Sequence, residues 1–269
     1  MEVSTAPSSI HPGSKIARAK RATRILIATD FGGTLCRPGD DFRREGCIPE
    51  AISALSRLSV VPGVHLAIVS GRGGEELSAR CADLPSCWKV SDHGRACIDP
   101  HGDMLCDWPS HAGTGPLERA WLQGEMLFQG SPVSMARKRF SVLVRLPTDP
   151  KPALQDPIAR WSSICRSFGL EVVRGRGFVE SLVPGFDKKR ALVRLSAHLR
   201  CDFRIFGGDD GHDLPLLSEL SGRPDGLAVF VRSPDRPTPG IRVDEMVDGP
   251  EGWAAWLGDL ADLLESRSS

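Results

Sequence analysis

The stretch from Ile25 to Thr34 constrains the fold more than any other part of this 269-residue chain. It opens with the apolar run Ile25-Leu26-Ile27-Ala28 and reaches an acidic residue, Asp30, two positions later. A short apolar run that ends at an acid and is followed by two glycines predicts a buried strand that stops at a carboxylate. Ligands bind at the carboxyl ends of strands in open α/β sheets. Asp30 is therefore a candidate nucleophile.

The bulk composition is that of an ordinary globular protein. Hydrophobic residues make up 41% of the chain and charged residues 25%, which excludes a disordered or fibrous chain. Acidic and basic residues balance at 34 each, so we expect neither a nucleic acid nor a membrane surface as partner. No run in the sequence approaches the roughly 20 apolar residues that span a bilayer. Eight cysteines without a C-x-x-C pair favour reduced thiols and therefore a cytoplasmic protein. We also expect the protein to be a monomer.

The order of predicted elements favours a doubly wound, Rossmann-like parallel sheet, because strands that alternate with helical crossovers run parallel. The first half of this pattern consists of strands at 25–28, 64–69 and 88–90 and helices at 49–59 and 74–82. The second half consists of helices at 188–199 and 253–264 and strands at 203–206 and 227–231.

A smaller α+β module interrupts the pattern. It begins at a Ser/Gly/Pro-rich joint near 109–116 and contains predicted helices at 117–128 and 158–168 and strands at 140–146, 170–173 and 178–182. We therefore expect the α/β class, with a core formed by 25–109 and 185–269 and an inserted cap formed by 110–184. Residues 1–24 are basic and rich in Ser and Pro. They favour a disordered tail, and a transit peptide is the alternative.

Polar clusters follow four of the predicted core strands, and a lysine opens the helix after the cap. The clusters are Asp30 with Thr34, Ser70-Gly71-Arg72, Asp92-His93 and Asp209-Asp210 with Asp213, and the lysine is Lys188. Because parallel strands bring their carboxyl ends to one edge, we expect these groups to converge. Several carboxylates together suit Mg²⁺, and a lysine and a hydroxyl beside them suit a phosphoryl group. Taken singly, each cluster also fits a turn, a helix cap or a solvated charge.

The ordered set of motifs resembles the haloacid dehalogenase superfamily and, within it, the trehalose-6-phosphate phosphatases. That family carries D-x-D-G-T, S-G-R, H-G, E-x-x-P with D-K, and G-D-D-x-T-D-E. The corresponding segments here are Asp30-Phe31-Gly32-Gly33-Thr34, Ser70-Gly71-Arg72, His93-Gly94, Glu180 with Pro184 to Lys188, and Gly208 to Asp213. The similarity covers most of the chain and keeps the motifs in order.

The resemblance implies a Mg²⁺-dependent sugar-phosphate phosphatase, with Asp30 as nucleophile and Lys188 neutralising the phosphoryl charge. The metal ligands that it implies are Asp30, the Gly32 carbonyl, Asp209 and Asp213. The implied phosphate contacts are Thr34, Ser70, Gly71 and Lys188. The implied sugar contacts are Arg72, His93, Lys138 and Glu180. Lys138 lies between two arginines, so surface charge is an alternative interpretation for it.

Gly32 departs from the family pattern, which has an acid here that protonates the leaving oxygen. Without that acid we expect reduced activity, since general acid–base help contributes about 10²–10⁴ in rate. Three hypotheses stay open: a slow phosphatase, a pseudo-phosphatase that binds a sugar phosphate as sensor or partner subunit, and an enzyme that transfers the phosphoryl group to an acceptor other than water. The candidates for supplying the missing proton are His93, Asp210 and His212, which replaces the family's threonine.

Overall fold

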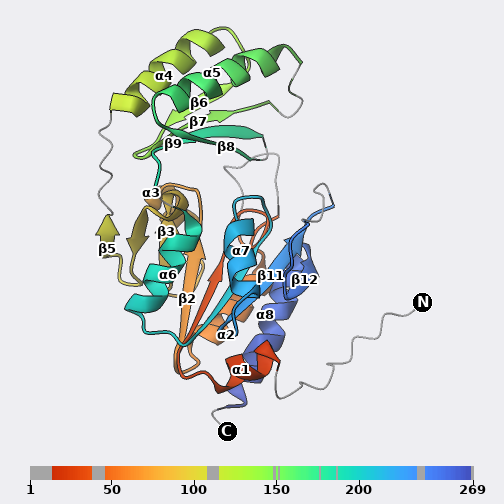
Figure 1. Ribbon diagram of the computed structural model, residues 1–269. Coiled ribbons are helices and arrows are strands. Elements are labelled where there is room, and N and C mark those ends of the chain that lie inside the picture. Colours follow the sequence, from red (N-terminus) through yellow and green to blue (C-terminus); the bar gives the residue numbers. More distant parts are fainter. Residues whose placement is uncertain are drawn as a thin grey trace, which may run out of the picture.

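The chain forms a large α/β core with a smaller cap beside it (Figure 1). This computed structural model describes residues 14–37, 46–107, 115–147, 150, 152–175, 177–185, 187–234 and 240–267. The predicted fold class, a mostly parallel α/β core with an inserted α+β module, is confirmed. The joint predicted near 109–116 falls largely outside the described residues, and the boundaries of core and cap stay a prediction.

The core is built on an eight-stranded sheet with the order β12-β11-β10-β1-β2-β3-β4-β5. Its strands are β1 Ile25–Thr29, β2 Val64–Val69, β3 Trp88–Ser91, β4 Ala96–Ile98, β5 Met104–Asp107, β10 Phe203–Gly208, β11 Gly226–Arg232 and β12 Glu245–Asp248. The strands from β12 to β3 are parallel, whereas β4 and β5 add an antiparallel edge. The sequence did not predict β4, β5 or β12.

The packing of strand β1 explains why its first four residues, Ile25 to Ala28, are all apolar. Ile25 and Ile27 pack into a cluster that includes residues of α2 Pro49–Ser59, α3 Gly74–Arg80 and α8 Gly249–Glu265. Leu26 and Ala28 pack on the opposite face, among residues of α6 Lys188–His198 and α7 Leu214–Ser221. A strand covered on both faces needs a continuous apolar run, and its alternate residues feed two separate cores.

The prediction that residues 1–24 form a disordered tail is wrong for part of that range. Helix α1, Lys15–Arg21, begins at Ser14, whose side chain accepts the N–H of Ala17. The Lys15 ammonium donates to the carbonyl oxygens of Leu220 and Ser221 and to Asp244. These partners lie about two hundred positions along the chain, so the local sequence gives no sign of them. Residues 1–13 lie outside the described part.

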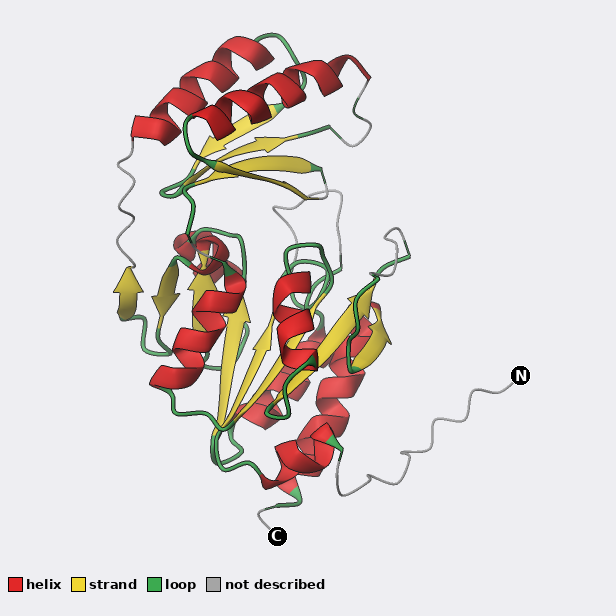
Figure 2. Ribbon diagram, viewed as in Figure 1, coloured by secondary structure: helices red, strands yellow, loops and turns green. Residues whose placement is uncertain are grey.

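The cap pairs two helices with a four-stranded antiparallel sheet of order β6-β7-β9-β8. Its elements are α4 Gly115–Phe128, β6 Ser134–Arg137, β7 Ser141–Arg145, α5 Gln155–Ser167, β8 Glu171–Gly175 and β9 Phe178–Leu182. The helices cover the face of the sheet that points away from the core, as Figure 2 shows. Trp161 fills the cap interior and donates from Nε1 to the carbonyl oxygen of Ala120 at 2.9 Å. The other face of the cap sheet is thereby left to meet the core.

The helices and the cysteines bear on two expectations from the sequence, the absence of a membrane span and reduced thiols. Among their helices, none combines the length and the apolar character that crossing a bilayer requires. The cysteines whose side chains are described are free thiols.

Candidate active site

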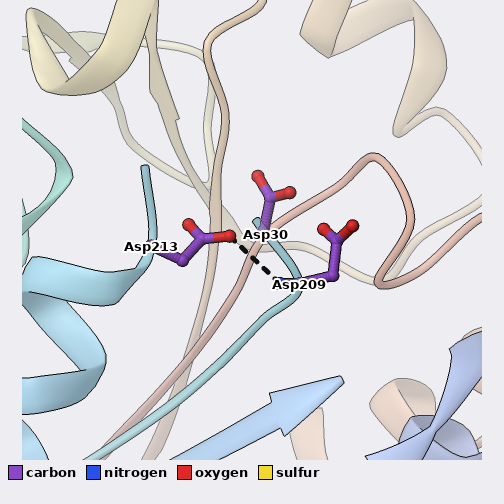
Figure 3. Close-up of side chains that lie close together, drawn as sticks. All are labelled: Asp30, Asp209 and Asp213. Atoms are coloured by element: carbon purple, nitrogen blue, oxygen red, sulfur yellow. Dashed lines mark hydrogen bonds between the residues drawn. The ribbon is translucent and has the colours of Figure 1, made fainter. Parts of the chain in front are cut away.

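Three aspartates meet at the carboxyl end of the parallel sheet. Strand β1 runs alongside β10, and the N–H of Asp30 donates to the Gly207 carbonyl at 2.8 Å. This pairing places Asp30 beside Asp209, which follows β10, and beside Asp213, which precedes α7 (Figure 3). All three side chains are buried, and their ligand oxygens lie within 4.8 Å of one another. The predicted convergence of these acids is confirmed.

Lys188, the first residue of α6, supplies the positive charge of the cluster. Its Nζ donates to Asp30 Oδ1 at 2.6 Å and to Asp213 Oδ1 at 2.8 Å. Burial disfavours the ammonium form, but the nearby carboxylates of Asp213 and Asp30 outweigh this and raise the pKa of Lys188. The lysine is therefore charged at the site, where it can face an anionic group.

Asp213 is held on both sides. Its Oδ2 accepts the backbone N–H groups of Asp209 at 3.1 Å and Asp210 at 3.2 Å, while Oδ1 accepts from Lys188. Burial raises the pKa of Asp213; Lys188 opposes this rise, and the negative charges of Asp30 and Asp210 add to it. The site thus contains more negative charge than its lysine neutralises.

This charge excess fits a divalent cation. Three carboxylates against one ammonium leave two negative charges in a buried place, and an oxygen-only ligand set suits Mg²⁺. Asp30 and Asp209 would hold such an ion. Asp213, whose two oxygens already accept hydrogen bonds, fits contact through water better than direct ligation.

The two glycines after Asp30 differ in their surroundings. Gly33 has φ +84°, and a Cβ there would lie 2.3 Å from Asp209 Oδ2, so no larger residue fits. A Cβ at Gly32 would meet nothing within 4 Å. Thr34 is fully buried and donates from Oγ1 to Asp209 Oδ1 at 3.2 Å. Its hydroxyl thus orients a carboxylate of the site, and its implied phosphate contact stays a prediction.

Ser70, Gly71 and Arg72 follow β2 and lie against the turn after β3. The carbonyl of Ser70 accepts the His93 N–H at 3.1 Å, and that of Arg72 accepts the Asp92 N–H at 2.7 Å. A Cβ at Gly71 would lie 2.4 Å from His93 Cε1, which explains the glycine. Arg72 pairs with Glu76 at 2.5 Å and covers the Phe31 ring at 5.4 Å, beside Asp30. The ligand contacts implied for Ser70, Gly71 and Arg72 are untested.

The cap sheet brings Glu180 and Lys138 to the core. Glu180, on β9, accepts hydrogen bonds from Lys138 Nζ at 2.9 Å and from the Ser141 hydroxyl, and it lies 3.0 Å from His93 Nε2. Lys138 also donates to the Gly71 carbonyl at 3.1 Å. Burial raises the pKa of Glu180, but His93, Lys138 and Ser141 outweigh it and lower that pKa to about 2. Three of the implied sugar contacts are therefore neighbours across the border between cap and core.

The three candidates for the missing proton lie near one another. The His93 and His212 rings meet edge to face with centroids 5.7 Å apart, and Asp210 Oδ1 accepts the His212 N–H at 2.7 Å. Burial lowers the pKa of His212.

Sequence reasoning missed two residues of this region, Ser141 and Arg95. No motif marks either of them, because each acts through contacts made in the folded protein.

Comparisons with known proteins agree with this geometry. No family model matches the chain. Among curated proteins it is 29% identical over 209 residues to a bifunctional trehalose-6-phosphate synthase/phosphatase of Thermoproteus tenax, covering 74% of this chain and 27% of that protein. It is 27% identical over 240 residues to an uncharacterized glycosyl hydrolase of Mycobacterium tuberculosis, covering 86% of this chain and 18% of that protein. The chain thus spans well under a third of the length of either relative.

Solved structures match over most of the chain. The C-terminal domain of the C. albicans trehalose-6-phosphate phosphatase superposes with a TM-score of 0.79 at 18% identity, over 92% of this chain and 95% of that one. A trehalose-6-phosphate phosphatase related protein gives 0.72 at 22% identity, over 90% and 99%. A haloacid dehalogenase-like hydrolase from Bacteroides thetaiotaomicron gives 0.68 at 15% identity, over 88% and 99%.

The fold is similar to that of proteins of the haloacid dehalogenase type, as the motifs predicted, and the acidic cluster lies at the carboxyl end of its sheet. Within that class the chain is similar in structure, and distantly in sequence, to trehalose-6-phosphate phosphatases.

Proposed function

We propose that this chain is a Mg²⁺-dependent sugar-phosphate phosphatase, resembling trehalose-6-phosphate phosphatase, that works through an aspartyl-phosphate on Asp30. One observation carries the proposal: the Lys188 ammonium sits between Asp30 and Asp213, in a buried cluster that still holds excess negative charge. This arrangement suits a nucleophilic carboxylate that must meet a phosphoryl group beside a cation.

The reaction begins when an Asp30 carboxylate oxygen attacks phosphorus and the bond to the sugar oxygen breaks. The sugar oxygen leaves with the electron pair and takes a proton from water, since Gly32 has no side chain to donate one. Water then attacks phosphorus and breaks its bond to the Asp30 oxygen, which releases phosphate and restores the carboxylate. The proton that this water loses neutralises the hydroxide left by the first step. Lys188 stays beside the transferred group and offsets its charge. A Mg²⁺ held by Asp30 and Asp209 would lower the repulsion between the nucleophile and the phosphoryl oxygens.

The substrate has two parts, and we assign them to different residues. Phosphate contacts fall to the Ser70 hydroxyl and the Gly71 amide. Sugar contacts fall to Arg72, His93, Lys138 and Glu180, which lie where the cap meets the core. Closure of the cap over a sugar would exclude bulk water during transfer.

Phosphate release from trehalose-6-phosphate and from a panel of other sugar phosphates tests this function. We expect slow release with Mg²⁺ present, and none from Asp30→Asn. Asp103→Asn is a matched control, because Asp103 is exposed on the edge hairpin of the core sheet. Wild-type protein that releases no phosphate from any member of the panel contradicts the proposal.

The glycine at position 32 favours a second candidate, a protein that binds a sugar phosphate without turning it over. Calorimetry with trehalose-6-phosphate separates the two, since tight binding without phosphate release supports a sensor or partner subunit. Transfer to an acceptor other than water predicts phosphorylated Asp30, which mass spectrometry detects.

A further inference from the structure

The turn Asp92–Arg95 lies at the border between core and cap and has an unusual backbone. Asp92 has φ 50°, His93 has φ 56° and Gly94 has φ 102°, so three successive residues are left-handed. Residues with a side chain rarely adopt this conformation, and it persists only where the surroundings hold it. The contacts of this turn therefore indicate what it is shaped to meet.

Gly94 meets the chain just before Lys188. A Cβ at Gly94 would lie 2.5 Å from the carbonyl oxygen of Asp187. Asp187 is the N-cap of α6 and directly precedes the lysine that contacts Asp30. The turn thus touches the segment by which the chain returns from the cap to the core.

Arg95 holds the same segment by its side chain. It is 1% exposed, and its guanidinium donates to the carbonyl oxygens of Val183 and Pro184, the latter at 3.3 Å. The guanidinium also lies over the ring of Phe140 in the cap, with 5.2 Å to the ring centroid. The Arg95 side chain of the core therefore contacts both the segment after β9, at Val183 and Pro184, and the Phe140 ring of the cap.

His93 contacts the cap through a pair of side chains. Its Nε2 lies 3.0 Å from Glu180 of the cap. A sugar hydroxyl can replace either partner of such a side-chain pair. The contacts of Arg95 go instead to backbone carbonyls and to a ring, and its side chain is buried.

We propose that the turn Asp92–Arg95 is a seat for the cap, in which Arg95 is a positioning residue that fixes the crossover and His93 provides the releasable contact. The placement of the cap stands independently of the reaction. The kinetic consequences rest on the proposed phosphatase function.

Distance measurements between cap and core test the seat in the full chain. Spin labels attached to p-acetylphenylalanine at the exposed positions Met126 and Met246 leave the native cysteines untouched. We expect one narrow distance distribution in the wild type, a broad one in Arg95→Met, and intermediate broadening in Arg95→Lys and His93→Ala. Arg119→Met is the matched control, because Arg119 covers Phe168 within the cap, and we expect it to match the wild type.

Folding is checked in each variant by circular dichroism. If Arg95→Met does not fold, Arg95→Lys and His93→Ala decide. A folded Arg95→Met that keeps the narrow distribution overturns the proposal, as does a wild-type distribution in both milder variants.

Steady-state kinetics give a second readout, because a merely structural role would not separate an effect on kcat from an effect on KM. We expect Arg95→Lys to lower kcat by roughly ten-fold or more through misplacement of the cap and the α6 start, and His93→Ala to act mainly on KM. Unchanged kcat in Arg95→Lys, together with unchanged distances, overturns the positioning role. If the wild type itself shows no turnover, the proposed function fails, and the distance measurement still decides the seat.

Discussion

Core and cap each bury a carboxylate beside a lysine, yet the two carboxylates titrate in opposite directions. In the core, burial and the neighbouring acids Asp30 and Asp210 raise the pKa of Asp213 against the pull of Lys188. In the cap, the pKa of Glu180 falls to about 2, because His93, Lys138 and Ser141 outweigh its burial. The core cluster therefore needs additional positive charge, whereas the cap cluster is satisfied by the protein itself.

Adding an acid to the core should have the largest effect. Gly32→Asp supplies the absent proton donor, and a Cβ fits there without contact. We expect kcat for sugar-phosphate hydrolysis to rise by about 10²–10⁴. The neighbouring Gly33→Asp is the control and should lose activity, since its Cβ would collide with Asp209. An unchanged rate in Gly32→Asp would mean that another group already donates the proton.

Replacing the lysine of each cluster tests the difference between the core and cap clusters directly. Lys188→Met leaves the core acids without their buried partner and should cost about 3–5 kcal/mol of unfolding free energy without Mg²⁺. Lys138→Met leaves Glu180 with His93 and Ser141 and should cost about 1–3 kcal/mol. Urea denaturation with and without Mg²⁺ measures both, and Mg²⁺ should restore stability in Lys188→Met only. Equal losses would contradict the difference between the two clusters.

The pH dependence of stability isolates the cap carboxylate. Since the pKa of Glu180 is lowered from 4.5 to about 2 on folding, its contribution is complete above pH 4.5 and disappears as pH falls toward 2. That contribution amounts to roughly 3 kcal/mol. The difference in unfolding free energy between wild type and Glu180→Gln should therefore shrink across this window. A constant difference would rule out a lowered pKa at Glu180.

We expect the smallest effect on activity from replacing one of two buried tryptophans, Trp253 in the core and Trp161 in the cap. Trp253 donates from Nε1 to Thr29 Oγ1 at 3.0 Å, and Thr29 in turn donates to the Asp30 carbonyl at 2.9 Å. Trp161 makes the corresponding bond to Ala120 inside the cap. Replacing either by Phe loses a hydrogen bond that contributes about 1 kcal/mol, and in both variants the smaller ring also leaves a cavity that adds to this cost. Only Trp253→Phe should also lower kcat, because only that bond supports Asp30.

The core site was predictable because topology alone brings its residues together. Asp30 and Asp209 follow β1 and β10, which are adjacent and parallel. Parallel pairing places the carboxyl ends of both strands at the same edge of the sheet. The cap contacts depend on more than topology. Glu180 lies within β9, and it meets Lys138 and His93 only through the pairing of the cap sheet and the placement of the cap on the core.

Three core strands that the sequence did not predict, β4, β5 and β12, share a physical cause. Strand β12 carries Glu245 and Asp248 at a sheet edge, so it shows no apolar run. Strands β4 and β5 are short and form the opposite edge. Arg95 gives no signal in the sequence, because a single arginine after a glycine is ordinary until its carbonyl partners are known. Such features depend on long-range contacts rather than on local pattern.

The end of helix α8 has a practical consequence for handling the molecule. Arg267 Nη1 donates to the Ala22 carbonyl at 2.7 Å, which fixes that end near the start of β1, remote from the cap (Figure 1). A biotin or affinity label joined after α8 would immobilise the protein with its cap turned toward the bulk solution. Surface-based binding assays in that orientation would leave the border between cap and core accessible to the proposed sugar phosphate.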